Sequence, residues 1–571
     1  MKIDSLQQFN NYQNRPIQNS KKNPAQANPN FTGLPIAAAQ VLNFLDTSPA
    51  WGANFVDFAF MVTPRTLTDF TRGVNAGMET ARRESMGTIN DSSVGLYGTL
   101  AGAALATGVA KAYGFKNKEI SSVFADSETI DMMGDIWHKD ANMPLQQKIE
   151  AALSKYEVFK NDKDGKAGKW VKFKDEDIKK AASILTDELG KSDKLSKEAM
   201  NNVKNILTSS NSLENNFRII AENGAKQHSS RYNVGSIVEN TFKLSKLYTK
   251  DKVAEAFKAA SGVAENKFLK ALKGLNMKRS IAGVLIASLV GCSVQPINMW
   301  LTKRKTGSDS FVGGGKKDDS AKFKIKKALT ATVFGAGVIA TIGNPKNLLK
   351  NLQFKGFTPT ISQLKFIYGA TIMSRFMSAR NDNELKESAT KDVLGFVNWL
   401  ILGNFVQKLV AQGLDKDLIK QEKKGGILNW ITSSSLKTRN EVLHEELKDK
   451  AFKDGKALNF KELMKAVNNL EDKGITKAAK KKLGILTLAQ LAGYAYSGLV
   501  LGIGIPRLNI ALTKRRLAKQ AANEAKNPQQ DAQQTDDKML SPENREFLKQ
   551  KNFTGVDLLK PKAEKEQEAA A

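Results

Sequence analysis

Four stretches of this chain contain no charged residue over a length that can cross a lipid bilayer. They are Ser92–Ala110, Ser280–Thr302, Ala328–Pro345 and Leu483–Pro506. A helix needs about 20 consecutive apolar residues to span a hydrocarbon layer of about 30 Å. Because four such runs are more than a soluble helical core ordinarily requires, they predict an all-α, polytopic helical membrane protein.

Three further apolar segments are shorter or carry charges. Val393–Gln407 is followed by a lysine, and Pro35–Val62 and Ile361–Met377 each contain charged residues. Each of the last two segments either spans the bilayer or lies flat at its interface. Counting them gives about 5–7 spans.

The charged residues within these weaker segments are candidates for a function. Ionisable groups at membrane depth usually face a cavity or a partner. Asp57, Arg375 and Lys408 are therefore candidate intramembrane polar residues that line a permeation path. The alternative is that their segments lie at the interface, where the charges are in water.

Glycines in the uncharged runs are spaced for close helix packing. Gly98 and Gly102 form one G-x-x-x-G pattern, and Gly498 and Gly502 form another. Small residues at this spacing let two helix backbones approach closely in lipid. We expect these four glycines to lie at helix–helix contacts.

A seven-residue pattern occurs twice, each time at the end of an uncharged run and after a proline, Pro296 or Pro506. Both copies read N-x-x-L-T-K-R, with Asn298, Thr302 and Arg304 in the first copy and Asn509, Thr513 and Arg515 in the second. Two copies in the same position relative to a predicted span indicate an internal repeat.

A second match precedes the repeated pattern in each half. Thr71-Arg72 followed by Arg83-Glu84-Ser85 resembles Ser374-Arg375 followed by Lys386-Glu387-Ser388. The order of parts is therefore the same twice and predicts a duplicated three-span unit, with a polar helical insert in each copy. The first unit is 36–307 and the second is 361–518, joined by the run 328–345.

The predicted organisation follows from these boundaries, and no strand-rich stretch stands out. The parts are a disordered tail (1–35), membrane segments of the first unit (36–113), a polar helical insert (114–279), membrane helices with a basic loop (280–345), membrane segments of the second unit (346–413), a second polar insert (414–482), a membrane helix with a basic flank (483–518) and a second disordered tail (519–571).

The net charge of +29 is densest in residues 301–360. The loop 303–327 is rich in lysine and arginine, and such short flanking loops stay in the cytoplasm. With seven spans, the loops 64–91 and 378–391 lie on that same side and both inserts lie outside. The basic loop then faces lipid, including anionic headgroups. Elsewhere lysines alternate with carboxylates as on solvated helix faces, which argues against nucleic acid as a partner.

Residue patterns for catalysis or metal binding are missing from the sequence. Cys292 is the single cysteine, and the three histidines have no histidine or cysteine at metal-ligand spacing. We therefore expect no catalytic, cofactor or metal site.

These patterns favour a multi-pass protein of a bacterial-type cytoplasmic membrane that moves a solute between its two units. The first alternative is a non-catalytic membrane scaffold whose inserts or tails dock protein partners. The second alternative is a soluble helical protein with hydrophobic runs.

Overall fold

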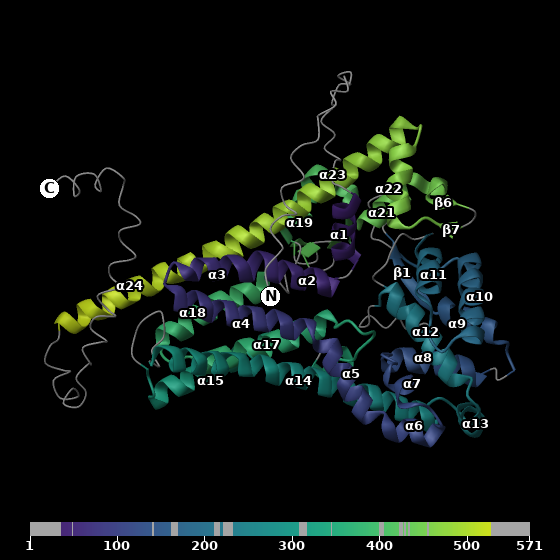
Figure 1. The fold of residues 1–571 in the computed structure, drawn as a ribbon, viewed down its shortest axis with the longest axis horizontal. Coiled ribbons are helices and arrows are strands. Elements are labelled where there is room, and N and C mark those ends of the chain that lie inside the picture. The colour runs from purple at the N-terminus through teal and green to yellow at the C-terminus, as the bar shows by residue number, and fades with distance from the viewer. Residues whose placement is uncertain are drawn as a thin grey trace, which may run out of the picture.

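The computed structural model describes residues 36–47, 49–139, 142–160, 169–209, 217–220, 232–307, 317–343, 345–398, 405–421, 426–427, 430–431, 434–453 and 456–526. This part of the chain is mainly helical, as the sequence predicts (Figure 1). The predicted tail 1–35 and residues 527–571 of the second tail lie outside the described residues. Residues 519–526 of that tail continue a helix.

A long helical bundle makes up one part of the molecule. Its first set of segments is α1 (Ile36–Thr47), α2 (Pro49–Asp57), the π-helical turn η1 (Phe58–Val62), α3 (Thr63–Phe70), α4 (Val74–Ser92), α5 (Val94–Leu105), α6 (Thr107–Tyr113) and α14 (Lys267–Thr306). Its second set is α17 (Ile361–Ser378), α18 (Asp382–Phe396), α19 (Phe405–Leu414), α23 (Lys473–Tyr496), the π-helical segment η6 (Ser497–Gly504) and α24 (Ile505–Lys526). Between the sets lie α15 (Ala321–Ile342), the short turn η2 (Pro345–Asn347) and α16 (Leu348–Asn351).

Local residues fix where the long helices begin and end. The Asn266 side chain accepts a hydrogen bond from the Leu269 backbone N–H, which caps α14. The same helix ends at Gly307, whose φ of 70° is the left-handed conformation that glycine adopts without strain. Pro296 lies inside α14 without ending it.

Three helical stretches of the described chain are long and apolar enough to cross a membrane, fewer than the 5–7 spans that the sequence predicts. They are Lys267–Lys305, Ala321–Ile342 and Lys473–Lys519. The uncharged run 92–110 is divided among α4, α5 and α6, so only the short helix α5 is apolar throughout. The run 393–407 lies partly outside the described residues.

The first insert is a separate compact region with its own apolar core of residues between 106 and 275. Its elements are α7 (Asn117–Ser121), α8 (Ser127–Lys139), α9 (Leu145–Ser154), β1 (Tyr156–Lys160), β2 (Lys169–Lys172), α10 (Asp175–Lys191), α11 (Lys197–Ser209), β3 (Phe217–Ile219), α12 (Val234–Tyr248) and α13 (Asp251–Ala259). The three strands form an antiparallel sheet in the order β2-β1-β3, in which Val158 lies opposite Val171 and Phe217. The insert is therefore helical with a small sheet, which the sequence does not predict.

The second insert is smaller and has two strand pairs. Its elements are η4 (Lys416–Leu418), β4 (Ile419–Gln421), β5 (Ser434–Leu436), α21 (Arg439–Leu447), η5 (Lys448–Ala451), β6 (Phe452–Lys453), β7 (Lys456–Ala457) and α22 (Phe460–Asn469). Leu443, Leu447 and Leu463 are buried in its core.

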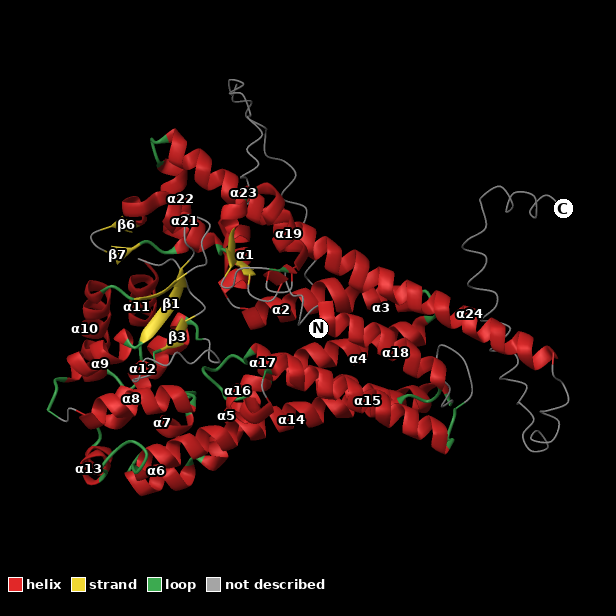
Figure 2. Ribbon diagram, turned by 180° about the vertical axis from the view of Figure 1, so that it is seen from behind, coloured by secondary structure: helices red, strands yellow, loops and turns green. Residues whose placement is uncertain are grey.

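Both inserts lie at the same end of the bundle (Figures 1 and 2). From that end, α14 and α23–η6–α24 run towards the opposite end, where α15 begins. Lys303, Arg304 and Lys305 at the end of α14 and the lysines of the first turns of α15 therefore lie far from both inserts.

Candidate functional site

Two polar helices, α4 and α18, bury charged residues against the other helices of the bundle. The sequence predicts loops at 64–91 and 378–391, and the structure corrects this prediction: each segment is mostly helix. Gly73, with a φ of 123°, turns the chain between α3 and α4. In the second half the Asn381 side chain accepts a hydrogen bond from the Glu384 N–H and starts α18. Charged helices can be buried here because partners on other helices neutralise them.

The repeated motif binds a glutamate of α4 in the first half. Asn298 donates from Nδ2 to the Glu79 carbonyl oxygen at 2.9 Å, and the Thr302 hydroxyl donates to the Glu79 carboxylate at 3.3 Å. Arg82 in turn donates from Nε to Asn298 Oδ1 at 2.9 Å. Arg304, also part of the motif, is exposed and lies over the Trp300 ring.

The second copy of the motif makes the same two bonds to a glutamate of α18. Asn509 donates to the Glu387 carbonyl oxygen, and the Thr513 hydroxyl donates to the Glu387 carboxylate, both at 3.1 Å. Arg515 is exposed, like Arg304. In both copies, therefore, the asparagine and the threonine bind the glutamate, and the arginine does not.

These contacts correct the register of the predicted repeat. The sequence match pairs Glu84 with Glu387, whereas the hydrogen bonds pair Glu79 with Glu387. In the corrected register the two segments share several further identical residues: Arg72 and Arg380, Asn75 and Asn383, Ala81 and Ala389, Gly87 and Gly395, and Asn90 and Asn398. Three more pairs are chemically similar: Thr80 and Ser388, Arg83 and Lys391, and Glu84 and Asp392. The sequence therefore contains a longer match in this register than the short match around Glu84 and Glu387.

Two arginines at equivalent positions cross between the halves. Arg72, between α3 and α4, pairs with Glu387 of α18 at 2.9 Å. Arg380, between α17 and α18, pairs with Glu79 of α4 at 3.7 Å. Each glutamate thus accepts hydrogen bonds from the motif of its own half and forms an ion pair with an arginine of the other half.

Glu84 is the centre of the buried charge. Its carboxylate lies 3.7 Å from Arg65, 3.1 Å from Arg83, 3.6 Å from Arg375 and 3.3 Å from Lys391. The Glu84 side chain is only 4% exposed, so these contacts are shielded from water. Charges from α3, α4, α17 and α18 therefore meet at one carboxylate.

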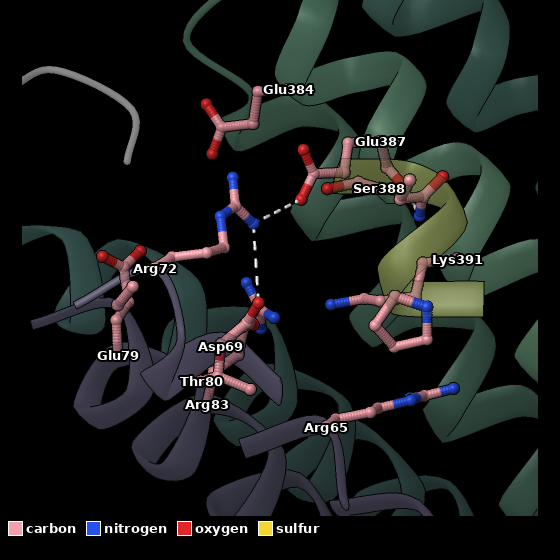
Figure 3. A pocket seen from close by; sticks show the side chains of 13 residues that line it. Arg65, Asp69, Arg72, Glu79, Thr80, Arg83, Glu384, Glu387, Ser388 and Lys391 are labelled. Atoms are coloured by element: carbon pink, nitrogen blue, oxygen red, sulfur yellow. Dashed lines mark hydrogen bonds and ion pairs between the residues drawn. The ribbon is translucent and has the colours of Figure 1, made fainter. Parts of the chain in front are cut away.

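A polar cavity of about 40 Å³ lies beside these ion pairs (Figure 3). Its charged lining comes from both halves and balances four cations against four carboxylates: Arg65, Arg72, Arg83 and Lys391 with Asp69, Glu79, Glu384 and Glu387. Figure 3 shows the Arg72 side chain between Asp69 and Glu387. In this conformation the cavity has room for a water molecule or two.

The three candidate intramembrane residues are all buried. Arg375 belongs to the charge network, because it also pairs with Asp392 at 3.0 Å. Asp57 accepts a hydrogen bond from the Thr88 hydroxyl at 2.5 Å. Lys408 is separate from the network and donates to the backbone carbonyl of Ile431 at 2.8 Å. Their predicted part in a permeation path stays a prediction.

The predicted packing glycines differ in how closely they are approached. At Gly98, a Cβ atom would lie 2.5 Å from the Phe354 ring, and α14 approaches at Gly283. At Gly502, it would lie 2.8 Å from the Phe60 carbonyl oxygen, and at Gly102 it would lie 2.7 Å from the Arg279 guanidinium. Gly498 has only ordinary contacts with Phe60.

Comparison with protein-family models, with curated protein sequences and with solved structures finds no match to this chain.

Proposed function

We propose that this protein is an integral multi-pass membrane protein in which a small polar solute passes between two duplicated units. The membrane part of the proposal rests on the distribution of side chains, because charged residues are buried in the bundle while many large apolar side chains are exposed. Arg65, Glu84 and Arg375 are buried. Large apolar side chains on the long helices are instead more than half exposed, namely Leu285, Leu289, Ile297 and Trp300 on α14, Ile325, Leu329 and Val333 on α15, and Leu488, Leu491 and Leu499 on α23–η6. Apolar surface of this extent suits lipid.

The duplication is supported by equivalent contacts rather than by sequence identity alone. α14 packs against α17, and η6 packs against α3, so the last helix of each half lies on the first helices of the other. Gly291 of α14 adjoins Thr371 of α17, and Gly502 of η6 adjoins Phe60 and Pro64. Because both inserts lie at one end, the two units are parallel, as in repeats related by an axis along the membrane normal.

The basic ends of the bundle support an orientation. Lys303, Arg304 and Lys305 lie at the end far from the inserts, together with lysines of α15. By the positive-inside rule this end faces the cytoplasm of a bacterial-type membrane, next to anionic headgroups, and the inserts face outward.

The ion pairs that cross between the halves are the observation on which the transport proposal rests. Arg72–Glu387 and Arg380–Glu79 join the two halves around the polar cavity. Separating the halves on this side would break both pairs and expose their charges to a solute. A solute with its own positive and negative groups can replace both partners, and thereby offset the cost of leaving buried charges unpaired. The cavity of this structure is then one state of an alternating path.

Flux into proteoliposomes tests the proposal. Vesicles containing the full-length protein are placed in isosmotic glycine, arginine hydrochloride or sodium glutamate, and light scattering reports swelling. We expect swelling faster than in protein-free vesicles for glycine, and a several-fold loss of that rate in Glu387→Gln. As a matched control, Glu445→Gln changes an exposed carboxylate of the second insert and should leave the rate unchanged. Swelling equal to that of protein-free vesicles in all three solutes would refute transport of these solute classes.

The first insert favours a second function, that of a membrane scaffold. It has its own apolar core and projects from the end of the bundle, as a docking domain would. A scaffold predicts that variants of the ion pairs change stability but no flux of any solute.

A further inference from the structure

One buried carboxylate of the bundle stands outside the charge network. Asp91, near the end of α4, is 2% exposed. Its Oδ2 atom has no hydrogen-bond partner among the described residues, and no lysine or arginine of that part of the chain forms an ion pair with it. An ionised carboxylate buried without a counter-charge is strongly destabilising. Either a proton or a bound cation must therefore neutralise Asp91.

Two hydrogen bonds between α2 and α4 arrange oxygen atoms around this position. The Thr88 hydroxyl donates to Asp57 Oδ2 at 2.5 Å, and Asn54 Nδ2 donates to Ser92 Oγ at 2.9 Å. Asp91 and Ser92 lie three and four residues after Thr88 on α4, so each of their side chains is a helical neighbour of Thr88.

The orientation of the Asn54 amide follows from the hydrogen bonds of Ser92. The Ser92 hydroxyl donates its one proton to the Thr88 carbonyl oxygen at 2.9 Å, so it can only accept from Asn54. The amide nitrogen of Asn54 therefore faces Ser92. Its carbonyl oxygen Oδ1 is buried, with no partner among the described residues. Two unpaired buried oxygens, one from each helix, thus remain at this contact.

The second half of the sequence has apolar residues at the corresponding positions. The positions equivalent to Thr88, Asp91 and Ser92 are Phe396, Trp399 and Leu400 in the sequence. Phe396 is buried and packs edge-on against Phe334 of α15. The oxygen-bearing residues are therefore particular to the first half of the sequence.

We propose that Asn54, Asp57, Thr88, Asp91 and Ser92 form a binding site for a sodium ion between α2 and α4. All of their free donor atoms are oxygens, the ligands that hard cations prefer. Arg65 and Arg375 act electrostatically on Asp57, and Asp57 and Arg375 act on Asp91. Arg375 is itself paired with Glu84 and Asp392. Asp91 forms no ion pair of its own among the described residues, so a single bound cation would compensate its charge.

Thermal unfolding of the full-length protein in detergent tests this site at pH 8, in sodium chloride against choline chloride at equal ionic strength. A ligand that binds the folded state raises its unfolding temperature. We expect sodium to raise the midpoint of the wild type by a few degrees, and Asp91→Asn to lose that response. In choline chloride, Asp91→Asn should be at least as stable as the wild type, because the unpaired charge is gone.

A second variant and a control make the outcome specific. Asn54→Ala removes one proposed ligand and should raise the half-saturating sodium concentration several-fold. Asp126→Asn, a change at a buried carboxylate of the first insert that is hydrogen-bonded by Thr129 and Tyr232, should keep the full sodium response. Equal midpoints for the wild type in sodium and choline would overturn the proposal, and would mean that Asp91 carries a proton. A larger rise with calcium than with sodium would also overturn it. Because these measurements report binding alone, their outcome is independent of the flux experiment.

Discussion

Helices α4 and α18 make equivalent contacts in the two halves, yet their chemistry differs towards their ends. Glu79 and Glu387 bind the same asparagine–threonine motif and the arginine of the other half. Further along, Thr88 of α4 corresponds to Phe396 of α18. The shared turns hold the halves together. The turns that differ make none of these shared contacts, and on α4 they include the unpaired Asp91.

The largest expected effect is a difference in stability between variants of Glu84 and of Asp392, the two acids at the middle of these helices. Glu84 lies within ion-pair distance of four cations, whereas its equivalent Asp392 pairs with Arg375 alone among the described residues. Removing one partner of a buried ion pair costs about 3–5 kcal/mol. We expect Glu84→Ala to lose at least that much, measured by thermal unfolding in detergent, and Asp392→Ala to lose less. Equal losses would show that the charge network has no single centre.

The two inserts should differ in their response to acid. His444 of the second insert is 6% exposed, and burial lowers its pKa to about 4. The neutral form is therefore favoured in the folded state, and the stability it contributes is present above pH 6.5 and is lost as the pH falls towards 4. The maximum loss is about 3 kcal/mol.

Hydrogen exchange of peptides from each insert measures this difference. Between pH 7 and pH 4.5, after correction for the intrinsic exchange rate, protection should fall in α21 and α22 more than in α8–α12. His444→Leu should remove the acid sensitivity of the second insert. An equal fall in both inserts, or a fall unchanged by His444→Leu, would assign the effect to other groups.

The smallest expected effect concerns the crossings where the last helix of each half meets the other half. A Cβ atom at Gly502 would lie 2.8 Å from the Phe60 carbonyl oxygen, and at the equivalent Gly291 it would collide with the Thr371 hydroxyl. We expect Gly291→Ala and Gly502→Ala each to destabilise the protein by about 1–3 kcal/mol. Gly337→Ala on α15 meets no neighbour and should be neutral or stabilising by about 0.5–1 kcal/mol. Thermal unfolding of the three variants compares them directly.

The sequence predicts the mainly helical fold and the asparagine and threonine of the repeated motif, because both follow from local patterns. It does not predict α4 and α18 as buried helices. In sequence, the polar composition around Glu84 resembles that of a solvated loop. The segment is buried because Arg375 and Lys391, which lie far along the chain, neutralise Glu84. The small sheet is missed for a similar reason, since Tyr156 of β1 pairs with the distant Ile219 of β3.

Other features of the site are likewise visible only in the three-dimensional contacts. The short match around Glu84 and Glu387 gave the wrong register, and only the bonds from Asn298 and Asn509 show that Glu79 is the equivalent residue. The apolar segment around Asp57 indicates that residue. No pattern indicates Asp91, because it borders an uncharged run, and its lack of a partner is visible only in the folded chain.

Cysteine labelling tests most directly whether the two halves lie parallel in a membrane. In a Cys292→Ser background, single cysteines replace Lys179 and Lys461 in the inserts and Lys305 and Lys519 at the other end of the bundle, all of them exposed positions. An impermeant thiol reagent should label the first pair in intact cells, and the second pair only in inverted vesicles. Labelling of Lys179→Cys and Lys461→Cys from opposite sides, or of all four positions from one side, would contradict the parallel membrane-spanning arrangement.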